Sequence, residues 1–163
     1  MTAEAPLLGG CACGAARYAL SAPPLFVHAC WCEECRRLTG GAFAHNLLIE
    51  ADRVRLTAGE IRDVPAPGAS GMPQRIFRCT ACATALWSLY GGREAIRFVR
   101  GGTLDDPSAA PPDVHVFARS APAWLSPPPG VRRFDAFYDR EAEWPAQSLA
   151  RRRAALAVHG ETG

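Results

Sequence analysis

The stretch Cys30-Trp31-Cys32-Glu33-Glu34-Cys35 places three thiols within six residues. Thiolates are soft ligands, and the short backbone between them lets all three converge on one metal ion. Zinc takes four protein ligands in a closed structural site, whereas a catalytic site keeps one position for water or substrate. The question raised by these three sulfurs is therefore whether a fourth protein ligand closes the site or whether the site is open for chemistry.

The other four cysteines form two pairs that are far apart in the chain. Cys11 and Cys13 form a CxC pair, and Cys79 and Cys82 form a CxxC pair. Two such pairs complete a tetrahedral site of four thiolates, where zinc contributes on the order of 10 kcal/mol to folding. Buried free thiols or redox pairs are the alternative, but two pairs in one chain favour structural zinc.

The three central sulfurs have no further cysteine to complete their site. The candidates for a fourth ligand are His28, His45 and His115, with aspartate and glutamate less favoured. A lone histidine is usually a hydrogen-bonded core or surface residue, so none of the three stands out. An open three-sulfur site and a site closed by another type of residue are both alternatives at this point.

Length and composition predict a soluble globular protein. The 163 residues are 48% hydrophobic and 21% charged, and 14 prolines and 15 glycines favour many turns and short strands. We expect one zinc-binding domain over residues 1–140 and a helical tail over residues 141–163. The sequence shows no secretory signal and no apolar run of membrane-spanning length, so we expect a cytoplasmic protein. In that compartment, clustered cysteines bind metal more often than they form disulfides.

The charged residues narrow the classes of function. All 18 basic residues are arginine, which excludes Schiff-base chemistry by a lysine. The formal charge of +2 becomes slightly negative once seven thiolates and two zinc ions are included. Phosphate binding needs a concentrated positive surface, so this charge argues against a nucleic-acid partner. We expect the consecutive Arg151, Arg152 and Arg153 to form a solvated face of a C-terminal helix.

Periodicity and turn residues predict a mainly β fold with short helices. Strands are expected at residues 16–20, 25–29, 42–50, 54–57, 75–78, 86–90, 96–100 and 114–118. A short helix is expected at residues 33–38, with Cys35 in its first turn, where the helix dipole favours a thiolate. Residues 64–73 hold three prolines and two glycines and predict a surface loop. Trp144 and Pro145 mark the start of a helix that runs towards Val158.

The order of the cysteine motifs resembles that of the glutathione-dependent formaldehyde-activating enzyme family, which shares a domain with centromere protein V. The resemblance covers about Gly9 to Tyr138. It rests on Gly9-Gly10-Cys11-Ala12-Cys13-Gly14-Ala15-Ala16-Arg17-Tyr18, Cys30-Trp31-Cys32-Glu33-Glu34-Cys35-Arg36-Arg37-Leu38-Thr39-Gly40, Phe77-Arg78-Cys79-Thr80-Ala81-Cys82, Gly102-Thr103-Leu104-Asp105-Asp106-Pro107 and Trp124. Seven cysteines in the family's order are specific for the family and much less specific for one reaction.

This resemblance implies a fold, two zinc sites and a reaction. The fold is the β-tent, which is made of folded antiparallel sheets with short helices. The resemblance implies a structural zinc on Cys11, Cys13, Cys79 and Cys82. It also implies a second, catalytic zinc on Cys30, Cys32 and Cys35. The family's name reaction joins formaldehyde and glutathione to form S-(hydroxymethyl)glutathione, which is formally a carbon–sulfur lyase reaction run in reverse.

Two residues depart from the family's pattern. Relatives often have histidine at the position of Trp31, and glycine usually follows the late CxxC where this chain has Ala83. Trp31 is either an apolar wall for a different substrate or a core aromatic that points away from the zinc. Arg36 and Arg37 follow the central cluster directly, so they are candidates for balancing its negative charge or for binding the carboxylates of a peptide-like thiol.

Two functions of different classes follow from these observations. The first is a zinc enzyme that adds a thiol such as glutathione to a small aldehyde. The alternative is a non-catalytic, zinc-stabilised module that binds a protein or nucleic acid, which a fourth ligand at the central zinc would favour. Methionine sulfoxide reduction needs a cysteine free of metal and ranks last. Asp105 and Asp106 precede Pro107 in a turn, so we expect them to cap backbone amides.

Overall fold

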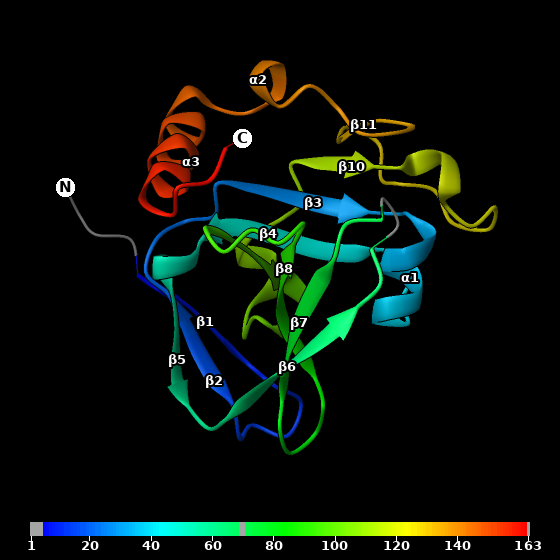
Figure 1. Ribbon diagram of the computed structural model, residues 1–163. Coiled ribbons are helices and arrows are strands. Elements are labelled where there is room, and N and C mark those ends of the chain that lie inside the picture. Colours follow the sequence, from blue (N-terminus) through cyan, green and yellow to red (C-terminus); the bar gives the residue numbers. More distant parts are fainter. Residues whose placement is uncertain (1–4, 69–70, 163) are drawn as a thin grey trace.

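The computed structural model describes residues 5–68 and 71–162, which fold mainly into β-strands (Figure 1). The strands are β1 (Leu7–Gly10), β2 (Arg17–Leu20), β3 (Phe26–Cys30), β4 (Ala44–Glu50), β5 (Val54–Ala58), β6 (Ile61–Ala66), β7 (Gln74–Cys79), β8 (Ala85–Tyr90), β9 (Ile96–Arg100), β10 (Val114–Val116) and β11 (Arg132–Arg133). The α-helices in these described ranges are α1 (Glu33–Thr39), α2 (Arg140–Glu143) and α3 (Ala146–Val158). Short 3-10 helices occupy Ala51–Arg53, Gly101–Thr103, Pro107–Ala109 and Ala118–Ser120.

The strands form two sheets. One has three antiparallel strands in the order β1-β2-β5, and the other has eight strands in the order β11-β10-β3-β4-β9-β8-β7-β6. Pairing in the large sheet is antiparallel except at β10, which runs parallel to both of its neighbours, β3 and β11. The prediction of a mainly β fold of antiparallel sheets with short helices and a C-terminal helix is therefore confirmed.

Strand β4 lies between two hydrophobic cores. Leu47 packs with Tyr18 and Trp87 in a core that joins the two sheets. The next residue, Leu48, packs with Trp144 in a second core, which the C-terminal segment covers. Successive side chains of a strand point to opposite faces, so burial of both faces accounts for the nearly continuous apolar run of β4.

The segment predicted as a surface loop begins as a strand. β6 includes residues 64–66, so the loop prediction was wrong for these three positions. The reason is the place of β6 at the edge of the large sheet, where Pro65 needs no hydrogen-bonding partner on its outer side. Residues 69 and 70 of the predicted loop lie outside the described residues.

Helix α3 confirms the predicted C-terminal helix. It packs against β4 and β9, and its residues Leu149 and Leu156 are buried in the second core. In Figure 1 the chain after β11 crosses the top of the large sheet through α2 and descends into α3. The boundary between a domain at residues 1–140 and a tail stays a prediction. No helix in the described part of the chain is long and apolar enough to cross a membrane.

The three consecutive arginines of α3 are not a solvated face, and that expectation was wrong. Arg151 donates to both carboxylate oxygens of Glu50 at 2.7 Å, and Arg152 is buried with a relative exposure of 7%. Only Arg153 is exposed. Residue 152 is three positions after one buried leucine and four before the other, so the packing of α3 turns its side chain towards the protein.

Candidate metal centres and active-site cavity

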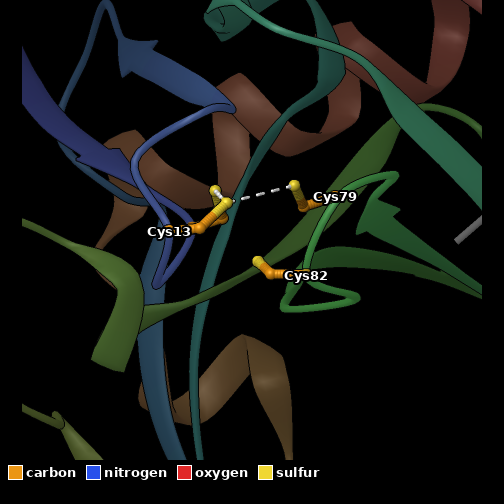
Figure 2. A group of neighbouring side chains, drawn as sticks. Cys13, Cys79 and Cys82 are labelled. Atoms are coloured by element: carbon orange, nitrogen blue, oxygen red, sulfur yellow. Dashed lines mark hydrogen bonds between the residues drawn. The ribbon is translucent and has the colours of Figure 1, made fainter.

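The first cysteine group joins the two sheets. Cys11 and Cys13 lie between β1 and β2, whereas Cys79 ends β7 and Cys82 lies in the turn before β8 (Figure 2). Their four Sγ atoms all lie within 4.8 Å of one another, with Cys11 to Cys13 at 3.4 Å and Cys13 to Cys79 at 4.0 Å. A tetrahedral zinc with Zn–S bonds near 2.3 Å separates its sulfurs by about 3.8 Å. This group therefore fits zinc.

Local hydrogen bonds favour the thiolate form of Cys11 and Cys82. The Thr84 hydroxyl lies 3.1 Å from Cys82 Sγ, and hydrogen bonds from the Thr84 side chain and backbone lower the pKa of Cys82 to about 5. The backbone N–H of Ala16 donates to Cys11 Sγ at 3.2 Å and lowers the pKa of Cys11. Both effects favour the thiolate, which is the form that binds zinc.

The turn that carries Cys82 contains a strained backbone. Ala83 follows it with φ at 59°, in the left-handed region that favours glycine. Its N–H donates to the carbonyl of Cys79 at 3.0 Å, which closes the turn. Glycine adopts this conformation without a penalty from Cβ, so alanine is accommodated here with strain.

The second cysteine group sits where β3 enters α1. Cys30 ends the strand, Cys32 is the N-cap of the helix and Cys35 lies in its first turn, as predicted. The three Sγ atoms lie within 4.8 Å of one another. Hydrogen bonds from Cys30 and then from Cys35 lower the pKa of the Cys32 thiol, and the N–H of Cys35 also donates to this sulfur at 3.4 Å. At least one thiolate is thus stabilised before any metal binds.

No residue of the described ranges joins this second group as a fourth ligand. Within the described ranges, no histidine nitrogen or carboxylate oxygen lies within 4.8 Å of all three sulfurs. His28 Nε2 lies 2.5 Å from the hydroxyl of Tyr138, and His45 Nε2 donates to a backbone carbonyl at 2.8 Å. His115 Nδ1 accepts from the indole N–H of Trp31 at 2.9 Å. All three candidate histidines therefore have other partners.

The three sulfurs of the second group open onto a cavity of about 400 Å³. Its floor is one face of the large sheet and its cover is the chain after β10. The lining residues are, from the sheet and the α1 region, His28, Cys30, Cys32, Glu34, Cys35, Asn46, Leu48, Gln74, Ser88, Tyr90, Arg93, Ile96, Phe98, Arg100 and Val116. From the covering segment they are Phe117, Phe137, Arg140, Trp144 and Arg152. The cavity is large enough for a small organic ligand.

Arg100 is a functional candidate that the sequence analysis missed. It is buried on the cavity floor and donates to Asn46 Oδ1 and, at 3.5 Å, to Ser88 Oγ. Burial lowers its pKa, and the nearby sulfurs of Cys35 and Cys30 act in the opposite direction because thiolates favour the charged guanidinium. Arg100 therefore supplies the cation that three thiolates need. Its position at the end of an apolar strand was the available signal.

The residues predicted to bind substrate lie outside this cavity lining. Arg36 and Arg37 line a separate pocket on the outer side of α1, and Arg37 pairs with Glu33 there. Trp31 is buried, with its ring 4.8 Å from that of Phe43. Their roles in substrate binding stay predictions.

The two aspartates of the GTLDDP stretch make structural contacts. Asp105 pairs with Arg17, and this ion pair lowers the pKa of the carboxyl group. Asp106 accepts from the backbone N–H of Ser108 at 2.9 Å and caps a 3-10 helix. The predicted capping role describes Asp106, whereas Asp105 fixes the loop by an ion pair.

This chain is similar to known proteins in sequence and in structure. A family model described as "Glutathione-dependent formaldehyde-activating enzyme" matches residues 6–120. A Halomonas elongata protein named "Putative glutathione-dependent formaldehyde-activating enzyme" is 30% identical over 125 residues, which cover 73% of this chain and 79% of that protein. The crystal structure of a Rhodobacter sphaeroides protein has a TM-score of 0.48 and 19% identity, over 63% of this chain and 94% of that chain.

The family match includes all seven cysteines and, of the segment that covers the cavity, only the residues up to 120. Phe137, Arg140, Trp144 and Arg152 are thus contributed by sequence that the family model does not include. The match nevertheless spans more than half of the chain. This chain belongs to the glutathione-dependent formaldehyde-activating enzyme family.

Proposed function

We propose that this protein is a zinc-dependent carbon–sulfur lyase-type enzyme that adds a thiol such as glutathione to a small aldehyde such as formaldehyde. The single observation that carries the proposal is the second cysteine group, whose three sulfurs line a cavity and lack a fourth ligand among the described residues. Three protein ligands and one open position are the arrangement of catalytic zinc. The family and the name of the Halomonas protein support the same substrates.

Two zinc ions fit the two donor sets. The group of four cysteines would hold a structural ion, and the group of three would hold the catalytic ion. When bound at the second group, zinc stabilises a substrate thiolate and polarises an aldehyde oxygen. Both groups need reduced thiols, so we place the protein in the cytoplasm.

The reaction needs no oxidant or reductant. A bond forms between the thiol sulfur and the carbonyl carbon, the C=O π bond breaks, and the proton of the thiol ends on the oxygen. Arg100 balances the charge of Cys30 and Cys35 at this end of the cavity. The apolar side chains of Phe98 and Val116 limit the water that reaches the reacting groups.

His28 is the neutral imidazole of the cavity. Burial lowers its pKa to about 3, so it carries no charge at neutral pH. The indole N–H of Trp144 donates to the Tyr138 oxygen at 2.6 Å, and the Tyr138 hydrogen is then available for His28 Nε2. This chain of hydrogen bonds places the proton of the ring on Nδ1. His28 is thus a neutral ring among the residues that line the cavity.

The proposal is tested by zinc analysis together with the exchange of glutathione and formaldehyde followed by NMR. We expect two zinc ions per chain and a rate above that of the spontaneous reaction. Cys35→Ser should lose one zinc and the added rate while the fold remains. Glu33→Gln is the matched control, because Glu33 is exposed on the same helix and does not line the cavity.

A folded protein with both ions bound but no added rate would contradict the enzymatic proposal. That result would favour the alternative of a zinc-stabilised binding module. Salt-dependent binding of nucleic acid would then identify one class of partner.

A further inference from the structure

Three arginines line the cavity at a distance from the cysteines. Arg93 lies between β8 and β9, Arg140 begins α2, and Arg152 lies on the buried side of α3. In the described part of the chain, none of the three guanidinium groups forms an ion pair with a carboxylate. Arg140 lies over the ring of Trp144 at 5.8 Å. These cations are therefore available to a ligand.

Arg140 and Arg93 also disfavour the charge of Arg152. Burial lowers the pKa of Arg152 first, and repulsion from Arg140 and Arg93 lowers it further. Glu141 raises the pKa of Arg152, but its carboxylate already lies 3.6 Å from the guanidinium group of Arg153. Buried cations without a partner are costly, and a carboxylate can bind a guanidinium through two parallel hydrogen bonds. An anionic ligand would remove this cost.

The positions along β9 separate Arg93 from the cysteines, and Arg93 and Arg140 both act electrostatically on Arg152. Arg100 ends this strand beside the cysteine group, and Ile96 begins it, three residues after Arg93. Four residue steps in a strand span about 13 Å. The cavity thus has a thiol-binding end and a cationic end, with Leu48, Ile96 and Phe98 among its lining residues. A ligand of tripeptide size can reach from one end to the other.

We propose that Arg93, Arg140 and Arg152 form an anion site that binds a carboxylate of the thiol substrate. The site makes the protein selective for carboxylate-bearing thiols over neutral ones. Two of its three cations come from sequence after residue 120, where the family model ends. The inference rests on the proposed function for the identity of the substrate as a thiol, but the anion site is defined by the arginines alone.

The test compares glutathione with its diethyl ester, which has the same thiol and no free carboxylate. We expect the KM of the wild-type protein to be lower for glutathione. Arg152→Gln and Arg140→Gln should each raise the KM for glutathione by about 10- to 100-fold, with kcat and the KM for the ester little changed. Arg153→Gln is the matched control, since Arg153 is the exposed neighbour of Arg152 and does not line the cavity.

A binding measurement separates this inference from the proposed function. S-methylglutathione keeps both carboxylates but has no free thiol, so it reports on the anion site without a reaction. Calorimetry with the zinc-loaded protein should show binding that Arg152→Gln weakens and Arg153→Gln does not. If this binding is observed but the protein does not accelerate the addition of glutathione to an aldehyde, the anion site is supported and the proposed enzymatic function is refuted. The anion site would be overturned if S-methylglutathione did not bind, or if glutathione and its ester had equal KM values. Equal effects of Arg152→Gln and Arg153→Gln on binding would also overturn it.

Discussion

Replacing Ala83 by glycine should stabilise the protein. Ala83 has φ at 59°, its side chain is exposed, and its N–H donates to Cys79 within the turn that holds two metal ligands. In this left-handed conformation a Cβ atom lies too close to the following carbonyl oxygen, and glycine has no Cβ. The substitution therefore removes strain without removing a packing contact of the core.

Two opposing effects decide the size of this change. Relief of the left-handed strain is worth about 1–2 kcal/mol. The greater freedom of glycine in the unfolded chain costs about 0.4–1 kcal/mol. The net gain in the free energy of unfolding is about 0.5–1 kcal/mol, which raises the Tm of a chain of this size by about 1–4 °C.

Thermal and urea unfolding of the zinc-loaded protein, followed by circular dichroism, measure this gain. Ala81→Gly is the matched control, because Ala81 is exposed in the same turn and is not among the described residues with positive φ. We expect this control to lose about 0.4–1 kcal/mol, because only the effect on the unfolded chain applies. A loss of stability in Ala83→Gly equal to that of the control would refute the account of strain at residue 83.

Three further predictions concern the metal groups and the cavity. Cys79→Ser should remove the structural zinc and unfold the protein, because on the order of 10 kcal/mol of binding free energy is coupled to folding; zinc analysis and circular dichroism check this. Arg100→Met should lower zinc affinity at the second group by about 10- to 100-fold in a chelator competition while the first group keeps its ion. His28 has its pKa lowered to about 3 in the folded protein, so the unfolded chain takes up this proton first as the pH falls below about 6.5. Proton uptake by the unfolded chain lowers the free energy of unfolding by about 2 kcal/mol at pH 5. Between pH 7 and pH 5 the urea midpoint of His28→Gln should therefore fall less than that of the wild-type protein. An equal fall in both proteins would contradict the burial of a neutral imidazole.

Short-range patterns predicted much of the fold and both cysteine groups. The spacing of Cys30, Cys32 and Cys35 is local, so a few backbone turns are enough to bring their sulfurs together. The two distant pairs were also predicted to converge, because each supplies half of a tetrahedron. β1 was not predicted, since Gly9 and Gly10 make its sequence look like a turn, although its pairing with β2 makes it a strand.

The cavity could not be predicted in the same way. Its cover and its floor come from segments more than 100 residues apart, such as Cys30 and Arg140, and no local pattern reports that contact. Arg152 was predicted to be solvated, because three consecutive arginines place polar side chains around most of the circumference of a helix. Arg152 is buried because it lies on the same side of α3 as Leu149 and Leu156, the side that packs against β4 and β9. Trp31 is buried beside His115 rather than in the cavity lining, a choice that the sequence left open.

Neighbouring positions on α3 have different tasks. Arg151 ties the helix to Glu50 and to the carbonyl of Pro23, whereas Arg152 faces the cavity. Consecutive residues of an α-helix are rotated by about 100°, so inserting one residue between Trp144 and Leu149 would bring Ala150 to the position of Arg151 and leave Glu50 without this guanidinium. The tie between α3 and β4 and one wall of the cavity therefore depend on the same helical register.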